Sequence, residues 1–532
     1  MRTLATSLLL ALVVSLAGAQ TVQHVVVVIQ ENRTPDNLFG ADSALIARGA
    51  NLWNLNTPAP CVIGGKSQPT LLQPYALDAC FDPQHGHNQA WLSMYAGGKM
   101  TGACDVKVDG ASCAPQLTYG NYTYVDNSTG TVTPYFNIAA NYGFANYMFQ
   151  TNQGPSFPAH QFLFSGTSAP TTYDDPSGYG TWFVAENPFL GGTLDNDAGC
   201  NQALTETAAQ IDPTGREAEG YTPPYPPGAG PGFPCYSHST MADVLDNAGV
   251  SWKYYPSGVQ TTYAIWTAPA SISSICGTVV DGQCTGEEWA THVALPTKLN
   301  QVPFLNDVEN CNLPAVSWVI PDGKWSDHPG HAGEDAGPSW IAAIVNAIGS
   351  STTLSNHNCE YWSNTVILIV WDDWGGWFDH VSPAAAAGGP GIGYPNQTGE
   401  QYVYGFRVPL LVVSAYAKPG YISGPASNPD CSQGNYYCHD FGSILNFIEY
   451  TFNLGASGIN PAYPYADTLA PDSPQVDAAS PYSLADFFGT QFHPFVYIAG
   501  AKYPPDCFVN PPLCFPGFEA SDPDNDAVDD QR

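Results

Sequence analysis

Two pairs of adjacent side chains with hard oxygen donors stand out in this sequence: Glu31 with Asn32, and Asp372 with Asp373. Each pair directly follows an unbroken run of β-branched and other apolar residues. Such runs are typical of central strands in a parallel sheet covered on both faces, and ligands bind just beyond the carboxyl ends of such strands. We therefore expect both pairs to open onto one crevice.

Together the pairs supply three carboxylates and one amide, the kind of oxygen ligands that a divalent cation prefers. Without a cation, four such groups brought together would cost free energy through charge repulsion and lost hydration. The sequence therefore predicts a metal site formed by Glu31, Asn32, Asp372 and Asp373. The alternative is that both motifs are ordinary acidic turns after strands.

A serine between the two pairs lies where a helix is predicted to begin. Ser156 follows Gly154 and Pro155 and precedes an apolar stretch. The backbone N–H groups and the positive dipole end of a helix start form a cradle for phosphate, and a cation-bound hydroxyl loses its proton more easily. Ser156 is therefore the candidate nucleophile and a further candidate metal ligand. The alternative is that it only caps the helix.

Several histidines near these motifs have the chemistry to act on a phosphate ester. An imidazolium can neutralise a phosphoryl oxygen and then protonate a departing alkoxide. The candidates are His85, His87, His328 and His380. Each of them could instead be a hydrogen-bonded loop residue. We assign to that second class His331, His357 and His439.

The elements that must position these residues alternate between strands and helices. Strands are predicted at residues 25–30, 251–255, 313–320, 364–371 and 408–415. Helices are predicted at residues 88–95, 240–247, 340–348 and 439–452. This alternation is typical of an α/β fold with right-handed crossovers, a mostly parallel sheet and helices on both faces.

The ends of the chain differ in composition from its middle. Residues 1–20 have the pattern of a secretory signal peptide, so we expect an exported protein, extracellular or periplasmic. Residues 21–500 are predicted to form the catalytic domain, with a Gly- and Pro-rich surface insertion at about 171–235. Residues 501–532 form a Pro-rich, acidic tail. No segment after the signal peptide is long and apolar enough to be predicted as membrane-spanning.

The 14 cysteines, an even number, indicate disulfides in an exported chain. Sequence cannot establish which cysteines pair, but close neighbours are natural first guesses. These guesses are Cys104 with Cys113, Cys276 with Cys284, Cys431 with Cys438 and Cys507 with Cys514. No CxxC pair occurs, which makes a structural zinc site the weaker interpretation.

The formal net charge is −33, with only 14 Lys and Arg residues against 47 Asp and Glu residues. A surface this acidic repels nucleic acid and anionic membranes at neutral pH. A nucleic-acid partner is therefore not expected.

Four motifs of the chain, taken together and in this order, match the pattern of a known protein family. They are Gln30–Gly40, Gly154–Pro158, Asp327–Pro329 and Trp371–Val381. In this order they resemble the phosphoesterase family of bacterial phospholipases C and acid phosphatases. The resemblance extends from about Val22 to Phe452.

The resemblance implies an alkaline-phosphatase-like core of three layers, α/β/α, and one divalent cation. It implies that Glu31, Asn32, Asp372 and Asp373 hold the cation, and that Ser156 both contacts it and attacks phosphorus. Water would then hydrolyse the phosphoseryl intermediate.

The resemblance also assigns the histidines. The positions that match the family's phosphate-binding histidines are His85, His328 and His380. His87 is assigned to substrate binding as a companion of these three. We also predict that His160, in the motif that carries Ser156, binds substrate, although the family commonly has another residue there.

The chain departs from the family where substrate choice is expected to be made. It has Ala159 and His160 where the family commonly has Asn and Arg, and Trp374 where the family commonly has His. The four oxygen ligands and the hydroxyl remain. The resemblance therefore transfers the core chemistry better than it transfers the identity of the substrate.

The sequence thus predicts a secreted, metal-dependent phosphoric ester hydrolase. Its substrate would be a small phosphomonoester or a phospholipid-type phosphodiester, and the ion could be Ca²⁺, Zn²⁺, Mn²⁺ or Fe. The nearest rival is a sulfatase-like ester hydrolase, whose Cys/Ser-x-Pro-x-Arg pattern lacks only its Arg at His160. A non-catalytic secreted carbohydrate- or surface-binding protein would suit the 13% aromatic content, but it has no need of the ligand pairs or the serine. The oligomeric state is left open.

Overall fold

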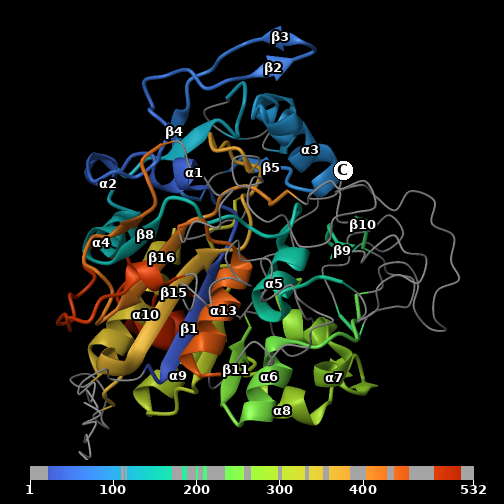
Figure 1. Ribbon diagram of the computed structural model, residues 1–532, viewed down its shortest axis with the longest axis vertical. Coiled ribbons are helices and arrows are strands. Elements are labelled where there is room, and N and C mark those ends of the chain that lie inside the picture. Colours follow the sequence, from blue (N-terminus) through green and yellow to red (C-terminus); the bar gives the residue numbers. More distant parts are fainter. Residues whose placement is uncertain are drawn as a thin grey trace, which may run out of the picture.

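The computed structural model describes most of the chain and the whole of the predicted sheet (Figure 1). The described residues are 22–78, 80–109, 113, 117–169, 183–188, 199–201, 208–211, 234–256, 265–297, 302–329, 335–351, 359–383, 403–427, 437–454 and 484–516. Outside them lie the predicted signal peptide, most of the insertion at 171–235, the end of the tail from residue 517, His331, His357 and Cys431.

A seven-stranded sheet forms the centre of the described structure. In spatial order its strands are β11 (Trp252–Tyr255), β14 (Val316–Val319), β1 (His24–Gln30), β15 (Thr365–Trp371), β16 (Leu410–Ser414), β8 (Gly143–Ala145) and β17 (Ile422–Ser423). Neighbouring strands are parallel except that β16 runs antiparallel to both β15 and β8. The predicted α/β class and mostly parallel sheet are confirmed.

The central strands β1 and β15 are in register along their full lengths, and they end together. Gln30 pairs with Trp371 at the carboxyl end, and the valines of β1 are buried. A strand covered on both faces needs apolar side chains in both directions, which explains the unbroken apolar runs. The two ligand pairs therefore leave the sheet side by side.

Helices cover both faces of the sheet. Neighbouring residues of a strand point to opposite faces, and on β11 the ring of Tyr254 contacts Phe164 of α5 (Ser156–Ser165) while that of Tyr255 contacts Phe304 of α9 (Pro303–Glu309). Helices α5, α6 (Met241–Ala248) and α13 (Phe441–Thr451) pack together, as do α9, α10 (Gly337–Gly349) and α4 (Thr133–Asn141). The result is three layers, helix, sheet and helix (Figure 1).

The predicted helices form close to their expected bounds. Residues 88–95 correspond to a π-helical turn at His87–Trp91 that continues as α3 (Leu92–Tyr95). Helices α6 and α13 begin after capping boxes whose N-caps are Thr240 and Asp440. These caps satisfy N–H groups that a helix start would otherwise leave unbonded, and so mark the two boundaries.

Shorter elements lie around this core. The helices are α1 (Pro35–Phe39), α2 (Ser43–Ala47), α7 (Ser273–Cys276), α8 (Glu287–His292) and α16 (Asp506–Val509). The strands are β2 (Val62–Ile63), β3 (Lys66–Ser67), β4 (Gln73–Tyr75), β5 (Asp82–Pro83), β6 (Val108–Asp109), β7 (Thr123–Val125), β9 (Phe183–Val184), β10 (Gln210–Ile211), β12 (Val279–Val280) and β13 (Gln283–Cys284). None of the helices in the described part of the chain combines the length and apolarity that crossing a bilayer requires.

Six disulfides are found among the described residues. They join Cys61 to Cys104, Cys80 to Cys113, Cys200 to Cys235, Cys276 to Cys284, Cys311 to Cys359 and Cys507 to Cys514.

Two of the guessed cysteine pairs, Cys276 with Cys284 and Cys507 with Cys514, are confirmed. The guess that Cys104 pairs with Cys113 is wrong, because the turn that carries Cys104 packs against β2, next to Cys61. The fourth guess falls on Cys431, outside the described residues. This density of disulfides is typical of proteins that fold in an oxidising compartment.

Candidate active site

The two ligand pairs meet at the carboxyl ends of β1 and β15. The backbone N–H of Asn32 donates to Asp372 Oδ1 over 3.0 Å, and the N–H of Arg33 donates to the carbonyl of Asp373 over 3.0 Å. Asn32 has a φ of +57°, a left-handed conformation that Asn tolerates better than most residues. Backbone bonds thus connect the two loops where the side chains must converge.

Ser156 lies against this meeting point. It is the first residue of α5, and its Oγ donates to Asp373 Oδ2 over 3.1 Å. Pro155 occupies the N-cap position, so Ser156 does not have the capping role considered as its alternative. A helix start, a hydroxyl and a carboxylate that accepts a hydrogen bond from this hydroxyl are therefore in contact. We call Glu31, Asn32, Ser156, Asp372 and Asp373 the ligand cluster.

The donor atoms of the ligand cluster suit a divalent cation. All five side chains are buried. Asn32 Oδ1 and Asp372 Oδ2 have no hydrogen-bond partner among the described residues, an arrangement that costs free energy unless something else binds them. Buried carboxylate and amide oxygens are the ligands expected of a hard cation. The cluster therefore fits the predicted metal.

His160, predicted to bind substrate, lies in direct contact with the ligand cluster. Its Nε2 is 3.2 Å from Glu31 Oε1 and 3.7 Å from Asp372 Oδ2. These three ligand atoms lie within 4.8 Å of one another. Burial lowers the pKa of His160 to about 4, so the ring is neutral at ordinary pH. A residue predicted to touch substrate thus contacts two of the predicted metal ligands.

His85 and His328 lie beside the ligand cluster. His85 Nε2 is 3.3 Å from Asn32 Nδ2 and 4.0 Å from Asp373 Oδ2, and the His85 and His328 rings are 6.2 Å apart. The Nδ1 atoms contact the carbonyls of Pro83 and Pro329 over 2.9 and 2.7 Å. We assign the neutral-ring proton to Nδ1 in both, because a carbonyl can only accept a hydrogen bond, and Nε2 is then the unprotonated nitrogen of each ring.

His87 and His380 are placed differently. His87 Nδ1 is 3.0 Å from the carbonyl of Gln153, and its ring stacks on Trp91, so it reaches the loop that leads to Ser156. His380 lies apart from the ligand cluster. Its Nδ1 is 2.6 Å from Asp36 Oδ2, and its Nε2 is 3.1 Å from Asn51 Oδ1. None of the contacts found for His380 in the described part of the chain is with Ser156 or a predicted ligand.

Sequence reasoning missed the residues that fix the loop after β15. The N–H of Gly375 donates to Asp373 Oδ1 over 2.6 Å, and the N–H of Trp374 donates to Gln150 Oε1 over 2.9 Å. Gly375 has a φ of +60°, and a Cβ there would lie 2.5 Å from the Asn32 carbonyl oxygen. The two glycines that follow Trp374 could have indicated this contact, since glycine is needed where two backbone segments approach each other this closely.

Arg407 is a second missed residue. Its Nε and Nη2 each donate to a different oxygen of Asp379 over 2.9 Å, and Nη2 is 3.5 Å from Asp36 Oδ1. We call Asp36, Asp379, His380 and Arg407 the arginine cluster. No local motif surrounds Arg407, so its role appears only once the fold brings it next to α1 and the loop after β15.

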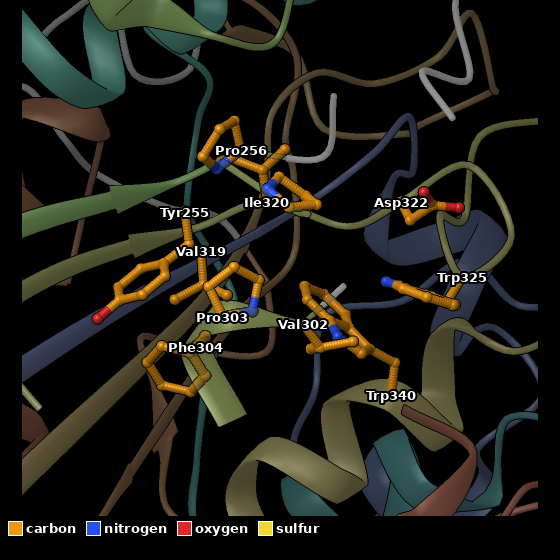
Figure 2. Close-up of a pocket in the computed structure, with 11 residues that line it drawn as sticks. Tyr255, Pro256, Val302, Pro303, Phe304, Val319, Ile320, Asp322, Trp325 and Trp340 are labelled. Atoms are coloured by element: carbon orange, nitrogen blue, oxygen red, sulfur yellow. The ribbon is translucent and has the colours of Figure 1, made fainter. Parts of the chain in front are cut away.

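A small hollow lies at the same edge of the sheet, where β11 and β14 end (Figure 2). Its walls are apolar apart from Asp322, with Trp325 facing Ile320 and Pro256 across it. The carbonyl of Trp325 accepts a 2.9 Å hydrogen bond from the side chain of Gln30, the residue before Glu31. The hollow is thus tied to the site by one side chain, although none of the ligand cluster lines it.

Comparison with known proteins identifies the family. The model of the phosphoesterase family matches residues 22–455. The chain belongs to the phosphoesterase family. It is accordingly a hydrolase of phosphoric ester bonds, and the predicted family is confirmed.

Curated relatives are phospholipases C. Phospholipase C A of Mycobacterium tuberculosis is 26% identical over 411 residues, which cover 75% of this chain and 68% of that protein. The non-hemolytic phospholipase C of Burkholderia pseudomallei is 29% identical over 251 residues, 41% of this chain and 32% of that protein. The hemolytic phospholipase C of Pseudomonas aeruginosa is 22% identical over 476 residues, 83% of this chain and 54% of that protein.

Among solved structures, one of Ps i-CgsB in complex with k-i-k-neocarrahexaose is 9% identical, with a TM-score of 0.32, and covers 85% of this chain and 76% of that one.

Proposed function

We propose that this phosphoesterase is a metal-dependent, phospholipase C-type enzyme that uses Ser156 as its nucleophile. The contact between Ser156 Oγ and Asp373 Oδ2, 3.1 Å long, carries the proposal. It joins a hydroxyl at a helix start to a carboxylate of the second ligand pair. The alternatives, two isolated acidic turns and a helix cap, do not require the three segments to meet.

The first half of the reaction transfers the phosphoryl group to the enzyme. The Ser156 Oγ–phosphorus bond forms as Asp373 accepts the hydroxyl proton, and the bond from phosphorus to the leaving alcohol breaks. That alkoxide takes a proton from the imidazolium form of His85, whose Nε2 lies 4.0 Å from Asp373 Oδ2, or of His328, whose ring lies beside that of His85. A divalent cation in the ligand cluster, when bound, supplies positive charge to the phosphoryl oxygens and to the serine oxygen.

The second half runs the same proton transfers in reverse. Water attacks the phosphoserine and gives its proton to the histidine that has just become neutral. The bond from phosphorus to Ser156 Oγ breaks, and Oγ takes back the proton that Asp373 holds. The enzyme returns to its starting state, and a phosphate monoester is released from a diester substrate.

The charge of the protein makes a local source of positive charge necessary. The formal net charge of −33 repels an anionic substrate, and the buried arginines of the described residues, Arg33 and Arg407, donate their hydrogen bonds elsewhere. Histidines and a cation are then what can attract a phosphate ester. This supports His85 and His328 in the chemistry. It leaves His380, held in the arginine cluster, without support from the geometry.

The relatives suggest the substrate class. Their names identify them as phospholipases C, so we propose a phospholipid phosphodiester as the substrate. The disulfides and the pattern of residues 1–20 support export, where such a substrate can be met outside the cytoplasm.

Replacing the nucleophile tests the proposal. Ser156→Ala should lower turnover of p-nitrophenyl phosphorylcholine by about 10³-fold or more, the effect expected when a nucleophile that acts with its base is removed. The matched control is Ser165→Ala at the other end of α5, where Oγ has no hydrogen-bond partner among the described residues. Its turnover should stay within about twofold of the wild-type value.

The same assay should be run with p-nitrophenyl phosphate and p-nitrophenyl sulfate as substrates, with and without a chelator. Chelation should abolish turnover of the diester, and readdition of metal should restore it. Preference for the monoester would replace phospholipase with phosphatase activity, and preference for the sulfate would replace it with sulfatase activity. Full turnover by chelated Ser156→Ala protein would rule out the mechanism.

A further inference from the structure

We infer that His160 is itself a ligand of the cation, so that the site has one imidazole nitrogen among its oxygen donors. The inference rests on the proposed function, because it takes the ligand cluster to be a metal site. It changes the role that the sequence suggested for His160, from contact with substrate to contact with the ion.

The position of Nε2 carries the inference. It lies 3.2 Å from Glu31 Oε1 and 3.7 Å from Asp372 Oδ2, so it faces two carboxylates of the ligand cluster at once. Donor atoms bound to one ion at about 2.0–2.4 Å lie at such separations from one another. A single N–H could point well at only one of the two oxygens, whereas a nitrogen lone pair and both oxygens can share one ion.

Nε2 is the nitrogen of the ring that faces the ligand cluster. His160 is buried, its ring stacks on Trp266 with centroids 6.2 Å apart, and Nδ1 has no hydrogen-bond partner among the described residues. Helix α5 also carries Ser156, one turn earlier, so both side chains reach the cluster from one rigid element. Asp372 Oδ2, without a hydrogen-bond donor in the described structure, is a second atom that an ion would satisfy.

An imidazole ligand would alter the choice of metal. An all-oxygen set suits Ca²⁺ or Mg²⁺, whereas a nitrogen donor favours ions such as Mn²⁺, Fe²⁺ and Zn²⁺. Arginine, which the family commonly has at this position, cannot act as a ligand because it keeps its proton. The exchange of Arg for His therefore adds a donor to the site.

Pulsed electron paramagnetic resonance on the full chain, stripped with chelator and reloaded with Mn²⁺, tests the assignment. The wild-type spectrum should show coupling to a directly bound ¹⁴N nucleus, and this coupling should disappear in His160→Gln. The control His328→Gln should keep it, because His328 lies outside the group of close ligand atoms. If His160→Gln fails to fold, His160→Asn and selective ¹⁵N-histidine labelling of the wild type give the same readout.

Calorimetry with Zn²⁺ and Ca²⁺ gives a second readout that does not depend on activity. His160→Gln should weaken Zn²⁺ binding by about 10–100-fold and change Ca²⁺ binding by less than about threefold. A bound Mn²⁺ without ¹⁴N coupling, or coupling that persists in His160→Gln, would overturn the inference and leave the proposed function intact. Failure of the wild type to bind any of these ions would overturn both.

Discussion

Two groups of buried carboxylates lie on the segments that follow β1 and β15, and the charges near them differ. In the arginine cluster, Arg407 bonds both oxygens of Asp379 over 2.9 Å and lies 3.5 Å from Asp36. In the ligand cluster, the ion pairs found among the described residues are with His160 and His85. The arginine cluster contains a permanent cation, whereas the ion pairs found for the ligand cluster in the described part of the chain are with imidazoles.

The pKa values in the arginine cluster show the effect of this compensation. Burial alone would raise the pKa of Asp36, but His380 and Arg407 hold it below its ordinary value. Burial raises the pKa of Asp379, an effect that Arg407 opposes. The arginine cluster thus has a permanent cation of its own, Arg407, beside both of its carboxylates. If the ligand cluster binds a divalent cation, as proposed, that ion supplies the positive charge that Arg407 supplies in the arginine cluster.

Removing the arginine should give the largest change in stability. Arg407→Met keeps the length of the side chain but leaves two buried carboxylates without their cation, which should lower the free energy of unfolding by about 3–5 kcal/mol. The loss should be the same with and without chelator in urea unfolding. Lys253→Met, which breaks the half-exposed pair with Asp307, is the control and should cost less than about 1 kcal/mol.

An Arg407→Met protein as stable as the Lys253→Met control would show that the arginine cluster does not depend on its charge balance. The difference between the two clusters could then not be explained by the charge of Arg407.

Neutralising one carboxylate in each cluster should change the free energy of unfolding of the chelated protein in opposite directions. Asp379→Asn should destabilise the protein in all conditions, because Arg407 loses its partner. Asp372→Asn should stabilise the chelated protein by about 1 kcal/mol, since an amide relieves repulsion beside Glu31. It should also remove the stabilisation by saturating metal, about 3–4 kcal/mol at 100–1,000 times the dissociation constant. Thermal unfolding with and without metal measures both effects.

If Asp372→Asn destabilised the chelated protein as much as Asp379→Asn does, the ligand cluster would be balanced by the protein alone. The cation would then be dispensable for its structure.

Strands and helix starts that depend on continuous patterns of residues could be predicted from the sequence. The apolar runs before Glu31 and Asp372 identified β1 and β15 because a strand buried on both faces must be apolar throughout. Their parallel pairing then brought the ligand pairs together. The helix start at Ser156 was likewise visible from Pro155.

Features that depend on direction or on distant partners were not predictable. The apolar run of β16 looks the same in either direction, so its antiparallel course could not be inferred. His380 is close in sequence to Asp373, yet it contacts Asp36, because spacing does not reveal which side of a loop a side chain faces. Arg407 has no local motif, and its two carboxylate partners come from different segments of the chain.

Asp327 is a third buried carboxylate, and its hydrogen-bond partners differ from those of both clusters. Asp327 Oδ2 accepts hydrogen bonds from Tyr135 and Trp371 over 2.8 and 3.0 Å, whereas Arg33 donates to the Asp327 backbone carbonyl. Its carboxylate is thus bonded by neutral donors, and burial raises its pKa to about 6.

The raised pKa predicts a pH-dependent stability. The folded protein keeps the Asp327 proton up to about pH 6, whereas the unfolded chain loses it near the ordinary value of 3.8, so wild-type stability falls as pH rises between these values. Asp327→Asn cannot ionise, and its stability relative to the wild type should increase by about 2 kcal/mol from pH 4.5 to 7. Urea unfolding in chelator across this range measures the difference, with exposed Asp281→Asn as the control that should stay constant. A constant difference for Asp327→Asn as well would mean that neutral hydrogen bonds suffice to balance a buried carboxylate here, and the ligand cluster would lose its strongest reason for requiring an ion.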